Sequence, residues 1–273
     1  MEIRLPSSGK MGIFKLNVRM PKLNDLREVS SLDDDENIAK TQFLLKLVEN
    51  KQDFFKISTY DRDFLFVMVA GNMFLNKLEF RYTCSCGEQV DETLNLAECS
   101  FETLSSEIQR VNKKRIYGVD YEFIIPSVLD ETKMFDWVYS IDDAVNATDP
   151  DAPEELKTLL RHRLEDGAVC MILGKEVNDE TIEWVRNLDL MVYFLALDFY
   201  VKVFHGFKTV KLCKCPKCGA KNIVKVPIVG GVKSFDTKDI IARFVMMQES
   251  IDFKSFMDLT IPEYVSLKNA QPI

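Results

Sequence analysis

Two cysteine-containing stretches are the strongest structural signal in this chain: Cys84-Ser85-Cys86-Gly87 and Cys213-Lys214-Cys215-Pro216-Lys217-Cys218-Gly219. Each stretch stands between two runs in which apolar and polar residues alternate, and this period of two predicts a β-hairpin with the cysteines at its turn. Two short hairpins that end in such cysteine turns, or knuckles, are typical of a zinc ribbon. Because the knuckles are far apart in sequence, a shared ion would clamp distant parts of the chain together.

Zinc in a structural site takes four ligands, and we expect Cys84, Cys86, Cys215 and Cys218 to supply them. The stretch from Cys215 to Gly219 has the usual knuckle spacing, with the glycine in the tight turn. The first knuckle has one residue between its cysteines rather than two, and Cys213 is left as an alternative ligand. A site made only of cysteines is closed, which predicts a structural rather than a catalytic metal. Disulfides and reduced, buried thiols are the alternatives; disulfides are disfavoured because no signal peptide opens the sequence.

Composition sets broad limits on the class of protein. The chain has 273 residues, is 47% hydrophobic and carries a formal net charge of −8, so it can bury one large core or two smaller ones. The longest apolar run, near 190–204, is interrupted by Asp198 and Lys202 and is too short for a membrane span. We therefore expect a soluble intracellular protein, and the negative charge disfavours general nucleic-acid binding.

One basic cluster departs from the overall acidity of the chain. Six lysines crowd the second knuckle: Lys208, Lys211, Lys214, Lys217, Lys221 and Lys225. The simpler interpretation is a solvated hairpin face, because the first three are not confined to one side of a strand. The alternative function is a cytosolic zinc-ribbon adaptor that binds nucleic acid through these lysines.

An internal repeat organises the chain. Residues 1–7 resemble residues 121–127, 64–68 resemble 193–197, and Cys84 and Cys86 align with Cys213 and Cys215. We interpret this as an α+β fold of two duplicated helix-helix-hairpin units joined by a split zinc-ribbon-like hairpin pair. The expected division is a first repeat unit over 1–100, a helical connector over 101–120, a second unit over 121–230 and a C-terminal helical tail over 231–273.

Local signals place the helices of each unit. In the first unit the acidic cluster 33–36 opens one helix, and Thr59 caps a second that runs to about residue 75. In the second unit a helix starts at Pro153 and ends at Gly167, and a longer helix runs over about 180–205. The tail is expected to form helices over about 237–249 and 253–259.

The chain offers little for catalysis. His162 is expected at the surface, and His205 at the end of an apolar helix, where a positive charge would suit the terminus. Neither histidine has a nucleophile at a recognisable spacing, and Ser8-Gly9-Lys10 is not a phosphate-binding loop because Arg4 stands where that motif needs glycine. The sequence therefore predicts a protein that is not an enzyme.

Several features together resemble one known family. They are the opening Leu5-Pro6-Ser7-Ser8-Gly9-Lys10, the acidic helix with a leucine-rich end, the stretch Tyr60-Asp61-Arg62-Asp63-Phe64-Leu65-Phe66, and the strand leading into Cys84. The chain is similar here to the baseplate hub-assembly proteins of T-even-type contractile-tailed bacteriophages, over residues 1–100 and more weakly over 121–230.

The resemblance implies a non-enzymatic structural or assembly protein of the tail baseplate hub. It would act through contacts with other baseplate or tail proteins, in the host cytoplasm during assembly. Whether it remains in the virion baseplate, and whether it forms a homo-oligomer, are left open.

Overall fold

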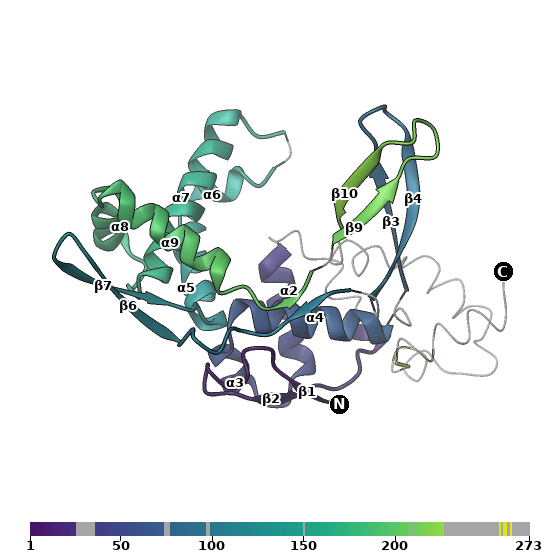
Figure 1. Ribbon diagram of the computed structural model, residues 1–273, viewed down its shortest axis with the longest axis horizontal. Helices are drawn as coiled ribbons and strands as arrows, with labels where there is room; N and C mark the ends of the chain where they lie inside the picture. The colour runs from purple at the N-terminus through teal and green to yellow at the C-terminus, as the bar shows by residue number, and fades with distance from the viewer. Residues whose placement is uncertain are drawn as a thin grey trace.

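The protein is seen here as a computed structural model that describes residues 1–25, 36–73, 77–96, 99–149, 151–208 and 210–226, together with Met257, Leu259, Thr260 and Glu263. Helices and small antiparallel sheets are mixed along the chain, so the expected α+β class is confirmed. Among the described residues the strands form five two-stranded sheets. Figure 1 shows a helical lobe on one side, a central group of helices, and two hairpins that rise together from that group.

The N-terminal part builds the largest core. Its elements are β1 (Glu2–Arg4), β2 (Lys15–Asn17), α2 (Glu36–Leu47), α3 (Lys51–Lys56) and α4 (Thr59–Met73). Phe43 of α2 and Phe66 of α4 are buried, and their rings meet edge to face with centroids 5.9 Å apart, an arrangement that adds to the stability from their burial. This core fixes the platform on which the hairpins stand.

The cap of α4 differs from the expected one. Ser58, not Thr59, caps the helix: its hydroxyl accepts a hydrogen bond from the Asp61 amide at 2.9 Å, and the Asp61 carboxylate accepts one from the Ser58 amide at 3.3 Å. This reciprocal pair is a capping box, which satisfies two amides that would otherwise lack partners. Thr59 lies one position too late to do this.

The two expected knuckle hairpins are present. The first consists of β3 (Lys77–Thr83) and β4 (Gln89–Asn95), and the second of β9 (Val210–Lys214) and β10 (Lys221–Lys225). Both pairs are antiparallel, in the register that places each cysteine turn at the tip. In Figure 1 the two hairpins lie side by side, with the tips pointing away from the body.

The segment 101–120 is not the expected helical connector. It contains β5 (Phe101–Glu102), which pairs with β8 (Gly206–Phe207), and β6 (Val111–Ile116), which forms a hairpin with β7 (Val119–Ile124). Tyr117 and Gly118 adopt φ angles of 50° and 85°, and two successive positive φ values are the mark of the turn that tight hairpins prefer. The charged residues that suggested a helix instead pair across the strands, as Lys113 does with Glu122 at 2.9 Å.

The helical lobe follows. It is made of α5 (Val128–Val138), α6 (Asp142–Asn146), α7 (Glu154–Ile172), α8 (Asp179–Arg186) and α9 (Leu190–Lys202). The helix from Pro153 does not end at Gly167 but continues five residues beyond it. A Cβ atom at Gly167 would lie 2.8 Å from Cγ of Met134, so this glycine allows α5 and α7 to pack closely rather than ending a helix.

The long helix expected over 180–205 is two helices. Asp189 caps α9, because its side chain accepts a hydrogen bond from the Met191 amide at 2.8 Å. The chain turns between α8 and α9, and α9 ends before His205. An aspartate that competes for nearby amides favours such a start over a continuous helix.

A buried ion pair joins the helical lobe to the central helices. Arg62 of α4 has a side chain 1% exposed and pairs with Glu131 of α5, whose side chain is 8% exposed. The same guanidinium bonds Asp63 at 2.9 Å and the side-chain oxygen of Asn37 at 3.0 Å. Burial of this charge is tolerated because several acceptors surround it.

Some expectations fall outside the described residues. These are most of the acidic cluster 33–36 and the tail helices over 237–249 and 253–259. The duplication of two units stays a prediction. Within the part of the chain that is described, no helix is both long and apolar enough to cross a membrane.

Candidate metal centre

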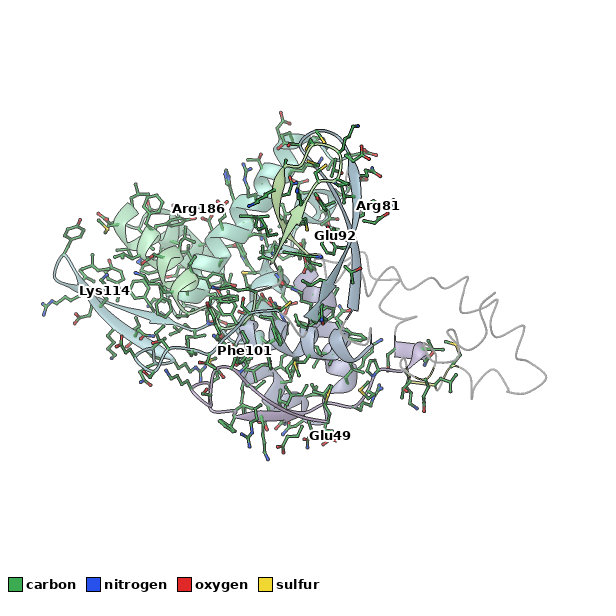
Figure 2. The ribbon with its side chains drawn as sticks, turned by 45° about the vertical axis from the view of Figure 1, so that its right-hand side comes forward. Glu49, Arg81, Glu92, Phe101, Lys114 and Arg186 are labelled. Atoms are coloured by element: carbon green, nitrogen blue, oxygen red, sulfur yellow. The ribbon has the colours of Figure 1, made fainter. Side chains whose placement is uncertain are left out.

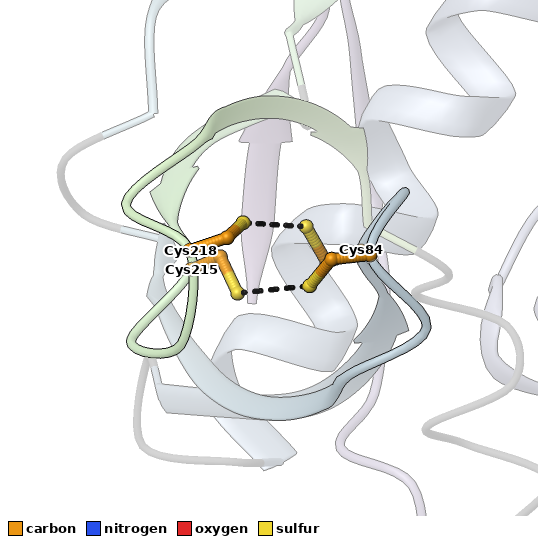
Figure 3. A group of neighbouring side chains, drawn as sticks. Cys84, Cys215 and Cys218 are labelled. Atoms are coloured by element: carbon orange, nitrogen blue, oxygen red, sulfur yellow. Dashed lines mark hydrogen bonds between the residues drawn. The ribbon is translucent and has the colours of Figure 1, made fainter.

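The two knuckles face each other at the tips of the hairpins and bring four sulfur atoms together. The ligand atoms of Cys84, Cys86, Cys215 and Cys218 all lie within 4.8 Å of one another. Figure 3 shows the sulfurs gathered between the turn of the first hairpin and that of the second. These are the four residues expected from the sequence, so the structure places the predicted ligand set at one point.

The distances fit a tetrahedral metal better than a pair of disulfides. Sγ of Cys84 lies 3.7 Å from Sγ of Cys218, and Sγ of Cys86 lies 3.8 Å from Sγ of Cys215. A tetrahedron with metal–sulfur bonds of about 2.3 Å has edges of about 3.8 Å, whereas the sulfurs of a disulfide are about 2.0 Å apart. The donor set and its spacing therefore suit zinc.

The pairing of cysteines follows a crossed pattern. The first cysteine of each knuckle, Cys84 and Cys215, is buried, and the second, Cys86 and Cys218, is exposed. Each close sulfur pair joins the first cysteine of one knuckle to the second cysteine of the other. Both knuckles thus present their thiols in the same way, one beneath the site and one at its outer side.

The short spacing of the first knuckle is explained by its turn. The Cys84 amide donates to the carbonyl of Glu88, four residues later, whereas the Cys215 amide donates to the carbonyl of Ala220, five residues later. The first turn is thus one residue shorter. In each turn the glycine after the second cysteine, Gly87 or Gly219, has a positive φ of 83° or 73°, a conformation that glycine adopts without strain.

Groups around the sulfurs complete the site. The side-chain amide of Asn222, on β10, donates to Sγ of Cys84 at 3.6 Å. Lys217 of the second knuckle pairs with Glu88 of the first at 3.0 Å. Asn222 was not predicted as part of the site, although the alternation of β10 places residue 222 on the same face as Val224 and Val226, which pack inward.

The thiols of Cys84 and Cys218 have pKa values shifted in opposite directions. The Cys86 backbone amide donates to the Cys84 sulfur and lowers the pKa of that thiol to about 6. The Ala220 amide has the same effect on Cys218, but hydrogen bonds with the other three thiols outweigh it and raise the pKa of Cys218 to about 12. Like charges this close oppose one another, and a divalent cation would supply the charge that balances four thiolates.

The remaining cysteines lie apart from the cluster. Cys213 is buried on the inner face of β9, with Sγ 3.9 Å from the carbonyl of Lys211, and burial raises the pKa of its thiol. It is not among the four clustered sulfurs. Because Cys213 lies outside the cluster, the geometry does not favour it as the alternative ligand. Cys170 lies in α7, and Cys99 lies near the end of the first hairpin.

Half of the lysine cluster is neutralised by the first hairpin and the strand after it. Lys211 pairs with Glu92 of β4 at 2.7 Å, Lys217 with Glu88, and Lys208 with Glu102 of β5. Figure 2 labels Glu92 on the hairpin. The ion pairs of Lys211 and Lys217 join the two hairpins, and all three pairs reduce the positive charge that nucleic acid would meet.

The two histidines lie in different surroundings. His162 is exposed on α7, as expected, but His205 is wholly buried rather than at a helix terminus. Nε2 of His205 lies 2.8 Å from the hydroxyl of Ser58 and 3.3 Å from Oδ1 of Asp61, and Nδ1 donates to the carbonyl of Val203 at 2.8 Å.

A catalytic triad uses one ring nitrogen for the nucleophile and the other for the carboxylate. In this chain the serine and the carboxylate share the same nitrogen, and all three side chains are buried. Asp61 also accepts a hydrogen bond from the amide of Ser7 at 3.0 Å. The network therefore joins the N-terminal turn, the start of α4 and the segment after α9, which is a structural role.

A family comparison covers most of the chain. A family model described as T4 bacteriophage base plate protein matches residues 1–235. No curated protein matches the chain. No solved structure matches it either.

Proposed function

Because the chain belongs to the family of T4 bacteriophage base plate proteins, we propose that it is a non-enzymatic structural or assembly protein of the hub of a contractile-tail baseplate. It acts through contacts with other baseplate or tail proteins, and a zinc ion clamps its two hairpins. The observation that carries the clamp is the convergence of four cysteine sulfurs within 4.8 Å of one another, from turns far apart in sequence.

The zinc site is a closed structural one. Cys84 and Cys86 hold the ion from the first hairpin, and Cys215 and Cys218 from the second. When bound, zinc supplies the positive charge that allows four thiolates to lie together and leaves no open position for a substrate. Asn222 stabilises the thiolate of Cys84 by hydrogen bonding, and such outer partners tune metal affinity.

The proposed role in the hub is more specific than membership of the family, and a separate observation supports it. Residues 1–100 carry the opening, the acidic helix and the cysteine turn that resemble hub-assembly proteins. We infer that the protein works in the host cytoplasm during assembly, and its family supports a location in the tail baseplate of the virion.

Exposed apolar residues on α9 support work through protein contacts. The side chains of Leu190, Phe194, Leu197 and Val201 lie at intervals of four, three and four residues on one helix face, with exposed fractions of 66%, 57%, 36% and 71%. A continuous apolar stripe on the surface is typical of an interaction site. Val192 and Ala196, on the opposite face, are buried in the core of the helical lobe.

The test is a phage that lacks this gene, complemented from a plasmid. Without the protein we expect infected cells to accumulate tail fibres and capsids but no complete base plates, as seen by electron microscopy of lysates. The wild-type chain should restore base plates, and Cys86→Ser should restore them poorly at high temperature. Normal base plates in the absence of the chain would refute the proposed role.

A further inference from the structure

The second hairpin has an outer face that is apolar at its centre and basic at its tip. It consists of three cross-strand pairs, Val210 with Lys225, Leu212 with Ile223, and Lys214 with Lys221. We call these six residues the outer hairpin face. All six are exposed, whereas the residues between them, such as Cys213 and Val224, turn toward the first hairpin or the core.

The apolar centre of this face is unusually open. Leu212 and Ile223 lie directly opposite each other and are 62% and 79% exposed. Neither of these two large aliphatic side chains belongs to a hydrophobic core formed by the described residues. Joint exposure of this kind points to a partner that covers them.

The lysines on the two sides of the second hairpin differ in whether they have an acidic partner. Each of Lys208, Lys211 and Lys217 has a glutamate partner within the chain. Lys214 and Lys221 form no ion pair with any residue that the structure describes, although they lie opposite each other across the strands. Like charges in this position destabilise a hairpin, and a carboxylate from outside would remove the repulsion.

We propose that the outer hairpin face docks an acidic segment of another baseplate protein, which places an apolar side chain over Leu212 and Ile223 and carboxylates beside Lys214 and Lys221. This inference rests on the proposed role in baseplate assembly and names the chemistry of one partner. Rim charges of this kind mainly govern how fast and how specifically two proteins meet.

Other occupants fit the face less well. A second copy placed symmetrically on the same face would set lysines against lysines. Nucleic-acid grooves use aromatic rings that stack on bases, or arginines that read them, and the outer hairpin face contains neither. The Leu212–Ile223 pair offers phosphates and bases no comparable contact, so a protein segment with acidic and apolar residues is the better match.

Photo-crosslinking in infected cells tests the proposal on the full chain. A p-benzoylphenylalanine replaces Ile223, and the crosslinked product is identified by mass spectrometry. We expect a crosslink to a segment of another baseplate protein that is rich in aspartate and glutamate. Crosslinking in lysate should fall severalfold when the salt concentration rises from 0.05 to 0.5 M, because salt screens exposed charges.

Charge reversal supplies the specific control. Lys214→Glu/Lys221→Glu should lower the crosslink yield at least fivefold. Lys51→Glu/Lys133→Glu, which makes the same charge change at exposed positions of α3 and α5, should leave the yield unchanged. All four positions are exposed, so the variants should fold, and circular dichroism checks this.

Several results would overturn the docking face. They are a crosslink to nucleic acid, to a second copy, to residues 227–273 of the same chain or to a neutral or basic segment, the absence of any crosslink, and a yield that survives reversal of Lys214 and Lys221. None of these results would contradict the proposed assembly role, which is tested by whether base plates form without the chain.

Discussion

Replacing Cys218 by serine should release the metal and loosen the junction between the two hairpins. The substitution removes one of four sulfurs at a closed site, and the hydroxyl of serine is a poor zinc ligand at neutral pH. Cys218 is exposed, so the change leaves no cavity in the core. Its effect on stability therefore reports the loss of the clamp.

The magnitude follows from the length of chain that the clamp closes. Cys84 and Cys218 are 134 residues apart in sequence. A cross-link that closes a loop of this size lowers the entropy of the unfolded chain by an amount equivalent to about 5 kcal/mol. Three remaining thiolates retain part of this, so we expect the free energy of unfolding to fall by roughly 3–5 kcal/mol, a large share of the stability of a typical domain.

The assay combines metal content with thermal unfolding. Wild-type protein should carry one zinc per chain by elemental analysis, and Cys218→Ser much less. The melting temperature of the variant should fall by roughly 10 °C, as measured by calorimetry.

Cys213→Ser is the matched control, since Cys213 is buried on the adjacent strand but lies outside the cluster. It should keep the full zinc content. Full zinc in Cys218→Ser together with zinc loss in Cys213→Ser would refute our ligand assignment.

Three further predictions concern the clamp and the packing of the helices. Removing zinc with a chelator, or lowering the pH below about 5 so that the thiols are protonated, should speed amide hydrogen exchange in both hairpins but not in α5 or α7; equal acceleration everywhere would argue against a local clamp. Gly167→Ala should destabilise the protein by about 1–3 kcal/mol because its Cβ would meet Met134 at 2.8 Å, and the cost measured by denaturant unfolding should shrink in a Met134→Ala background. Glu131→Ala should cost about 3 kcal/mol because it removes a buried partner of Arg62, whereas loss below 1 kcal/mol would show that the pair is dispensable.

The cluster of four cysteines was predictable from the sequence because local chemistry specifies it. Cysteines at the turns of alternating runs point to knuckles whatever the rest of the fold does, and four thiols suffice for one zinc. The strands beside them followed from the period of two, since each hairpin has one face toward the interior. The hydrogen bond from Asn222 to the Cys84 sulfur could have been predicted from the same alternation, but it was not.

The errors arose where distant contacts decide the structure. Gly167 looks like a helix end, but its lack of a side chain serves the approach of Met134 from another helix. The charged stretch around Lys113 looks helical until the turn at Tyr117 and Gly118 is recognised, because that turn brings Glu122 opposite Lys113. His205 gave no sign of burial, since its partners Ser58 and Asp61 are far away in sequence.

X-ray absorption at the zinc edge of the purified chain is the decisive test of the proposed zinc clamp. We expect one zinc per chain surrounded by four sulfur atoms at about 2.3 Å. A spectrum with nitrogen or oxygen ligands in place of sulfur, or folded protein that contains no metal, would contradict it.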